Sequence, residues 1–202
     1  DNLELGGAWG ELKAQGDLQH RLALNLALYD AAALWPPLEA QGELTGWLAW
    51  TDDWPHGALS GQLKKLGYQE WRVAELSLLA EQPVAMTAAD LQLKFTDLHK
   101  GDIELADLEL KLQGLPREHQ LQLQLNQNGN RVALALQGRL EQQTWRGRAA
   151  TLELSEQEIE SYTLVKPFEL SIDPAEMSFS EIQLQGNRGG WLSLSANWNR
   201  QN

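Results

Sequence analysis

The sequence predicts an all-β protein, a mostly antiparallel sheet assembled from repeated hairpin units. Leucine and polar residues alternate almost from end to end of the 202-residue chain, and successive side chains of a strand point to opposite faces of a sheet. Turn residues such as asparagine, glycine and proline separate the alternating runs. Helical periodicity is almost absent. Together these features indicate strands that each have one apolar and one polar face.

The clearest hairpin joins strands at 121–125 and 132–136 through Asn128-Gly129. Asn-Gly is preferred in the two-residue type I′ turn because both central residues have positive φ. A one-residue slip would move every apolar side chain to the wrong face, so the register is strongly specified. The turn therefore predicts three pairs on one apolar face: Leu125 with Val132, Leu123 with Leu134, and Leu121 with Leu136.

Alternating apolar residues indicate the other strands. In chain order, these residues lie at 18–28, 42–50, 59–63, 71–73, 76–78, 84–86, 91–95, 103–105, 108–112, 145, 152–154, 162–164, 168–172, 182–184 and 192–198. The apolar parity changes between 105 and 108, which predicts a β-bulge near Ala106 and Asp107. A three-residue loop over 187–189 predicts two further pairs on a single face: Leu184 with Leu192, and Ile182 with Leu194.

Several segments have the composition of connections. Pro36 and Pro37 lack the amide donors of a central strand, so 34–38 indicates a connection or an edge. Residues 52–57 have turn chemistry, and 97–102 is predicted to be a loop. The best helix candidate is 26–38, because 29–34 contains good helix formers. It is short and stops at Pro36, so a helical turn and an irregular connection both remain open.

A possible internal repeat has an offset of 91 residues. It relates five positions to five others: Trp71 to Tyr162, Val73 to Leu164, Met86 to Met177, Leu91 to Ile182, and Leu93 to Leu184. A fixed offset is typical of arrays that stack one unit on the next, although chance alternation also produces such matches. We expect 1–202 to form a single repetitive β domain, a fragment of a longer chain, with possible repeat units at about 50–110 and 141–202.

Composition limits the function. A net charge of −12 and a pI of about 4.7 argue against a nucleic-acid partner, which would require a basic surface. The chain has no cysteine and therefore no thiol chemistry. No apolar run approaches the roughly 20 residues of a membrane span, and no signal peptide begins at Asp1. Any targeting segment is expected to lie outside this sequence.

Catalytic and metal-binding patterns are not found. The four histidines lack zinc-ligand spacing (His20, His56, His99 and His119). Asp97, His99 and Asp102 could approach one another, and 156–160 is acidic, but a polar turn and a solvated connection explain these segments better. No nucleophile elbow, phosphate loop or dinucleotide fingerprint occurs. We therefore expect no enzyme activity, no metal and no cofactor, but a binding or conducting surface.

The apolar face must be buried by a second sheet, by closure into a barrel, or around an apolar ligand. The sandwich is the simplest alternative, but a monotonous leucine lining also suits fluid acyl chains. The nine tryptophans fit strand-end and core packing better than a lipid-interface belt. The candidate lining residues are Leu22, Leu24, Leu26, Leu91, Leu93, Leu108, Leu110, Leu112, Leu121, Leu123, Leu125, Val132, Leu134, Leu136, Leu152, Leu154, Ile182, Leu184, Leu192 and Leu194.

Short L-x-L-x-G runs, W-x-G units and aromatic-plus-proline units resemble the TamB family, part of the wider AsmA-like group. The matching segments are 42–46, 56–61 with 70–73, and 145–147 with 162–168. The resemblance implies a long curled, taco-like sheet with a leucine-rich hydrophobic groove. It also implies a protein of the Gram-negative periplasm, anchored in the inner membrane by an N-terminal helix, that meets an outer-membrane barrel partner, TamA, through a C-terminal region.

By this resemblance, the chain is an internal piece of a bridge that conducts phospholipid between the inner and outer membranes and supports outer-membrane biogenesis. TamA binding would then use regions outside this sequence. Two other hypotheses are a β-scaffold that binds outer-membrane protein strands by β-augmentation, and an enzyme such as a polysaccharide-active β protein. The enzyme would need facing carboxylates in a cleft, and the sequence does not indicate them.

Overall fold

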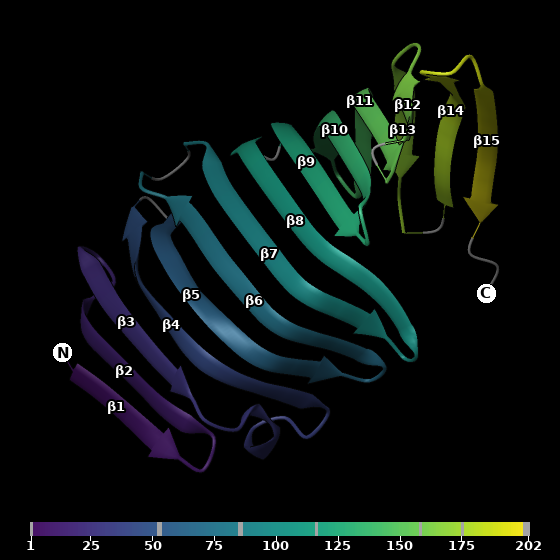
Figure 1. Ribbon diagram of the computed structural model, residues 1–202. Helices are drawn as coiled ribbons and strands as arrows, with labels where there is room; N and C mark the ends of the chain where they lie inside the picture. Colours follow the sequence, from purple (N-terminus) through teal and green to yellow (C-terminus); the bar gives the residue numbers. More distant parts are fainter. Residues whose placement is uncertain are drawn as a thin grey trace. The chain divides into compact units, whose positions relative to one another are not determined.

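The computed structural model describes residues 2–51, 54–84, 87–115, 117–157, 159–174 and 176–199 (Figure 1). Across these residues the chain forms one antiparallel sheet and a single 3-10 turn, η1 (Ala31–Ala33), so the predicted all-β fold is confirmed. The strands are β1 (Asn2–Gly7), β2 (Gly10–Asp17), β3 (Arg21–Leu28), β4 (Leu38–Thr51), β5 (Trp54–Tyr68), β6 (Trp71–Gln82), β7 (Ala89–Lys100), β8 (Ile103–Leu115), β9 (Glu118–Gln127), β10 (Asn130–Glu141), β11 (Thr144–Glu156), β12 (Glu160–Leu164), β13 (Phe168–Ile172), β14 (Glu176–Gly186) and β15 (Trp191–Asn199).

The topology is a meander in which each strand pairs with its predecessor. The apparent exception is β12 and β13, which both pair with β11 on one side and with β14 on the other. The pairs Glu153 with Thr163 and Arg148 with Glu169 follow almost the same register on β11. β12 and β13 are therefore two halves of one strand, interrupted at 165–167, where Pro167 cannot donate to a ladder.

The chain divides into two compact units, residues 1–109 (unit 1) and 110–202 (unit 2), with the boundary inside β8. The expected single domain and its repeat units at about 50–110 and 141–202 stay predictions. Met86, one member of the proposed repeat, lies outside the described residues.

Both predicted hairpin registers are confirmed. Asn128 and Gly129 have φ of 51° and 82°, and the three expected pairs between β9 and β10 form: Leu125 with Val132, Leu123 with Leu134, and Leu121 with Leu136. In the β14–β15 hairpin, Leu184 pairs with Leu192 and Ile182 with Leu194. In each hairpin the short turn therefore fixes the register of its two strands, as the alternation of apolar residues requires.

The predicted connections are partly wrong. The turn at 52–57 is shorter than expected because β5 begins at Trp54, which pairs with Thr51; Asp52 and Asp53 lie outside the described residues. The loop at 97–102 is also shorter, since β7 continues to Lys100. Between β3 and β4, Asp30 caps η1 by accepting from the amide of Ala32 at 3.1 Å. The helix candidate is thus a single turn inside a proline-terminated connection.

A line of irregularities crosses unit 1. The β4–β5 register shifts between Glu39 and Gln41, and Lys65 on β5 and Asp97 on β7 have φ of 53° and 51°. The amide of Asp97 donates to the carboxylate of Asp107 on β8 at 3.1 Å, next to the predicted bulge at Ala106 and Asp107. Aligned bulges bend and twist neighbouring strands together, so this line creases the sheet of unit 1.

Unit 2 has an equivalent line. The β10–β11 register shifts between Ala135 and Leu136, the break at 165–167 follows, and the β14–β15 register shifts between Phe179 and Ile182. The residues beside these shifts make the buried cluster of unit 2: Leu136, Ala149, Phe168, Ile182 and Leu184. The crease therefore brings apolar side chains of four strands together without a second sheet.

Candidate functional site

Cross-strand pairing places the leucines of unit 1 on one face in continuous rows. One row runs through Leu5, Leu12, Leu26, Leu44, Gly61, Leu78 and Leu93. The next runs through Leu3, Ala14, Leu24, Gly46, Leu59, Ala80 and Leu91. Each row crosses seven strands without a charged residue. The rows form a continuous apolar face, which we call the leucine face.

Glycines alternate with leucines on β4 and β5, so each Leu faces a Gly: Leu44 pairs with Gly61, and Leu59 with Gly46. A Cβ at Gly61 would collide with the carbonyl oxygen of Glu43, and a Cβ at Gly46 with that of Ala58. Only glycine fits where neighbouring backbones approach so closely. At the centre of the leucine face the surface is therefore low, because these glycines carry no side chain above the backbone.

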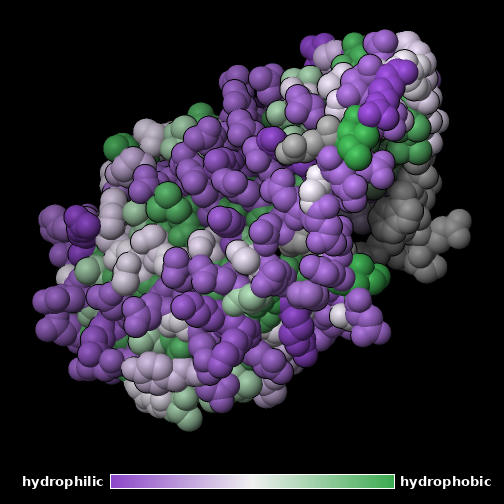
Figure 2. All heavy atoms as spheres, in the orientation of Figure 1, coloured by the Kyte–Doolittle hydropathy of each residue, from purple (hydrophilic) through white to green (hydrophobic). Residues whose placement is uncertain are grey.

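The opposite face of unit 1 is polar. Lys13 bridges Glu4 and Glu11 at 3.2 and 2.9 Å, and its hydrogen bond to Glu11 raises the pKa of the Lys13 ammonium. The same hydrogen bond lowers the pKa of Glu11. Figure 2 shows a face on which hydrophilic side chains predominate, with hydrophobic ones scattered between them. The sheet of this unit is therefore amphipathic.

In unit 2 the leucine face contains aromatic residues as well. One row runs through Leu121, Leu136, Ala149 and Phe168, and another through Leu125, Val132, Leu154, Tyr162 and Gly186. The Phe168 and Phe179 rings meet edge to face, with centroids 6.5 Å apart. This face is better filled than that of unit 1, since the buried cluster lies on it.

The predicted lining residues outside β8 fall on these two faces, with differing exposure. Pairing places five of them on the face of unit 1: Leu22, Leu24, Leu26, Leu91 and Leu93. The registers of unit 2 bring together Leu121, Leu123, Leu125, Val132, Leu134, Leu136, Leu152, Leu154, Ile182, Leu184, Leu192 and Leu194. Leu108, Leu110 and Leu112 are half-buried on β8. Leu136, Ile182 and Leu184 are buried, whereas Leu192 and Leu194 are exposed.

Other residues of the face were not predicted as lining. They include Leu12, Leu44, Leu48, Leu59, Leu63, Leu76, Leu78, Phe95, Leu164, Phe168, Leu170 and Phe179. For most of them, the alternation within their own strand already indicates that they belong to this face. The missing information is the register across the turns and creases, which cannot be read from one strand.

No second sheet packs on either face within the described residues, and most leucines there are only half-buried. The buried residues are few and include five alanines. The sandwich alternative is therefore not the structure of this chain.

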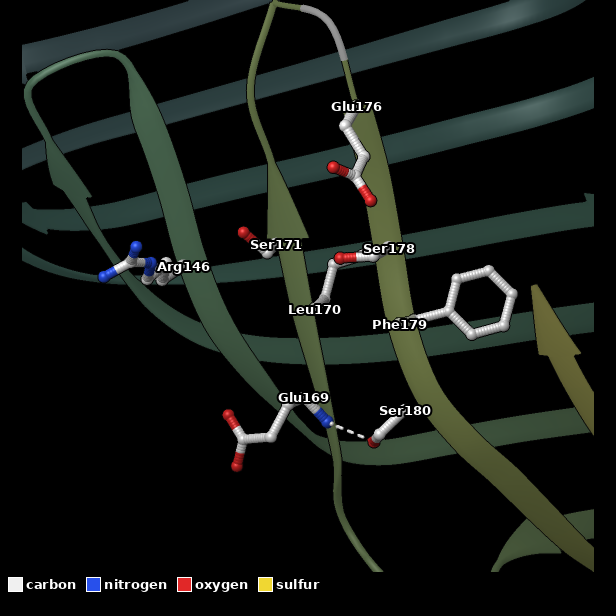
Figure 3. A pocket seen from close by; sticks show the side chains of 8 residues that line it. All are labelled: Arg146, Glu169, Leu170, Ser171, Glu176, Ser178, Phe179 and Ser180. Carbon is white, nitrogen blue, oxygen red and sulfur yellow. Dashed lines mark hydrogen bonds between the residues drawn. The ribbon is translucent and has the colours of Figure 1, made fainter. Parts of the chain in front are cut away.

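A hollow on unit 2 is lined mainly by polar residues (Figure 3). It is lined by β11, β13 and β14, and its one drawn hydrogen bond runs from the amide of Glu169 to Ser180 Oγ at 2.9 Å. Arg146 pairs with Glu141 at 3.3 Å.

The histidines and acidic residues do not converge. His20 pairs with Asp17 at 2.9 Å, which lowers the pKa of the Asp17 carboxyl, while His56 lies edge-on to Trp47. Among the described residues no three histidine, aspartate or glutamate side chains are placed to hold a metal ion. No helix in the described chain is long and apolar enough to cross a membrane.

An antiparallel sheet whose leucine side chains share one uncovered face defines a class of proteins that present an extended apolar surface. The chain belongs to the TamB family: the model of the family "TamB, N-terminal domain" matches residues 1–181. This is a transport and assembly family rather than an enzyme family, and membership supports a role in outer-membrane biogenesis in the Gram-negative envelope. Neither a curated protein nor a solved structure matches the chain.

Proposed function

We propose that the leucine faces line a hydrophobic groove that binds phospholipid and conducts it between the inner and outer membranes. The observation that supports this proposal is the uncovered face: its rows cross strand after strand without a charge, and no second sheet of the described residues covers them. Acyl chains would lie on leucine and the headgroup would stay in water. Each buried CH₂ contributes about 0.8 kcal/mol, and repeated similar contacts allow sliding.

The proposal includes the periplasm as the location, an inner-membrane anchor, and a TamA-type barrel partner bound through regions outside this sequence. These points rest on the family, whose members act in outer-membrane assembly. The leucine face itself does not indicate which protein partner binds.

Native mass spectrometry of the protein purified from a bacterial periplasm, followed by lipid extraction, tests the groove. Leu123→Asp with Leu134→Asp places two charges on the face of unit 2, because the two residues pair across β9 and β10. Co-purifying phospholipid should disappear in this variant. Gln120→Asp with Gln122→Asp adds the same charge on the exposed opposite side of β9 and should retain lipid. A lipid-free wild type, or equal occupancy in both folded variants, would contradict the proposal.

A second candidate is β-augmentation of outer-membrane protein strands. It is favoured by β1 and β15, each of which pairs on one side only within the described chain. Free strand edges are templates for an added strand. Replacing Leu5 with Pro would then weaken peptide binding at the β1 edge and leave the β15 edge available, whereas the charged pair on β9 and β10 would leave binding at both edges intact.

A further inference from the structure

Unit 1 exposes a cluster of large apolar side chains at one end of its strands. We call this cluster the aromatic rim and define it as Tyr29, Leu34, Trp35, Tyr68, Trp71 and Ile103. Their exposures range from 36% for Tyr68 to 61% for Ile103. They lie at the β3–β4, β5–β6 and β7–β8 connections, which meet at the same end of the sheet in an antiparallel meander (Figure 1).

The rim is held in place by its neighbours. Tyr68 pairs with Leu38 and with Trp71, and the Trp35 ring lies 5.3 Å from the Tyr68 ring. The guanidinium of Arg72 donates to the carbonyl oxygens of Gln69 and Trp71 at 2.8 and 2.9 Å. The amide of Gly101 donates to the carbonyl of Glu70 at 2.8 Å, which ties the β7–β8 turn to the β5–β6 turn. Rigid turns therefore present these rings to solvent.

Apolar side chains lie directly behind two rings of the rim. Two residues inward from Tyr68 and Trp71, the pair Leu66 and Val73 lies on the same side of the sheet, and Leu98 follows on β7. Val73 and Leu98 are buried. An apolar path thus leads from exposed aromatic rings to the buried residues behind them.

The chemistry of the rim fits a bilayer interface. Tyrosine and tryptophan carry an apolar ring with a polar atom, which favours the headgroup level of a membrane. The Lys100 ammonium sits 5.4 Å from the Trp71 ring centroid, a cation–π contact of the kind by which aromatic rings also recognise quaternary ammonium groups. Near the rim the acidic residues outnumber the basic ones, with Asp30, Glu39, Glu70, Asp102 and Glu104 against Arg72 and Lys100. Attraction to anionic lipid is opposed by the net charge of −12.

We propose that the aromatic rim docks on the surface of a zwitterionic phospholipid bilayer by inserting its rings among the headgroups. This goes beyond the lipid groove, because docking requires no lipid on the leucine face. Binding driven by ring insertion depends on buried apolar area, whereas electrostatic binding is screened by salt. The interaction therefore persists in salt at about 0.5 M.

Flotation of the protein with phosphatidylcholine vesicles tests the proposal. Trp35→Ser with Trp71→Ser should weaken vesicle partition about tenfold. Trp50→Ser with Trp54→Ser removes two equally exposed tryptophans from the opposite strand ends and should leave partition unchanged. Absence of wild-type binding, equal loss in both pairs, or binding only to anionic vesicles in low salt would overturn the proposal. So would self-association through the rim in sedimentation velocity, which would assign it to a second copy.

Bromolipid quenching keeps the proposal testable if the double variant fails to fold. Headgroup-proximal brominated phosphatidylcholine should quench wild-type fluorescence, and Trp71→Phe should reduce that quenching more than Trp50→Phe does. Equal reductions would overturn the proposal. The Leu123→Asp, Leu134→Asp variant should still dock on vesicles, so failure of docking and failure of the lipid groove are distinguishable.

Discussion

The indole Nε1 of Trp145 donates a hydrogen bond to Nε2 of His119 across 2.6 Å. The donor lies on β11 and the acceptor on β9, so the side chain crosses β10 at Gly138, which pairs with both His119 and Gly147. A Cβ at Gly138 or at Gly147 would collide with the indole ring. Since Nε2 accepts, the proton of the neutral imidazole lies on Nδ1, which donates to the carbonyl of Leu115 at 3.2 Å.

Removing the imidazole should destabilise unit 2 by about 1 kcal/mol, since a half-buried indole donor loses its partner. The expectation applies to His119→Ala, measured as the free energy of unfolding in urea. His119→Gln should recover part of the loss because the amide oxygen can accept from Trp145. Equal stability of the alanine variant and the wild type would show that the bond contributes nothing.

Adding one methyl group at Gly61 should strain the centre of the leucine face in unit 1. Gly61→Ala brings a Cβ onto the carbonyl of Glu43 and the side chain of Leu44, and we expect a loss of about 2 kcal/mol in unfolding free energy. The control is Gly101→Asn, because that turn glycine has open space around its Cβ position and asparagine tolerates its φ of 57°. Comparable losses in both variants would refute the steric explanation.

Ala149 and Ala150 are adjacent on β11 but differ completely in environment. Ala149 is fully buried in the cluster of unit 2, whereas Ala150 is exposed. Ala149→Leu should overpack that cluster and lower the melting temperature, at a cost of about 1–3 kcal/mol, while Ala150→Leu should change stability little. A larger effect at Ala150 would mean that the crease orients these residues differently.

The Tyr162 phenol donates to the Glu160 carboxylate at 2.8 Å, and this hydrogen bond raises the phenol pKa above its ordinary value of 10.0. A raised pKa stabilises the folded state below the unfolded pKa, and the contribution is lost as the pH rises through the folded pKa. Glu160→Gln should lower the phenol pKa, seen as earlier tyrosinate absorbance in an alkaline titration. Tyr162→Phe identifies the signal, and superimposable titrations of wild type and Glu160→Gln would contradict the assignment.

Local patterns predicted the strands and two registers well, because each depends on residues close in sequence. Asn128-Gly129 imposes positive φ on both turn residues, and the alternating leucines then leave one acceptable pairing. The segments 52–57 and 97–102 were predicted as connections, and this is wrong for residues 54–57 and 97–100. These residues lie in β5 and β7, where strand pairing supplies the energy that local propensity lacks.

The sequence by itself determined that this chain is an antiparallel β protein with one leucine face, since alternation with a period of two is a property of each strand alone. Tertiary structure decided that the described strands place no second sheet on that face, because alternation requires burial on one side without specifying what buries it. It also decided the creases at Lys65, Asp97 and 165–167, and the contact of Trp145 with His119 across a third strand. These depend on the alignment of neighbouring strands, which no single strand contains.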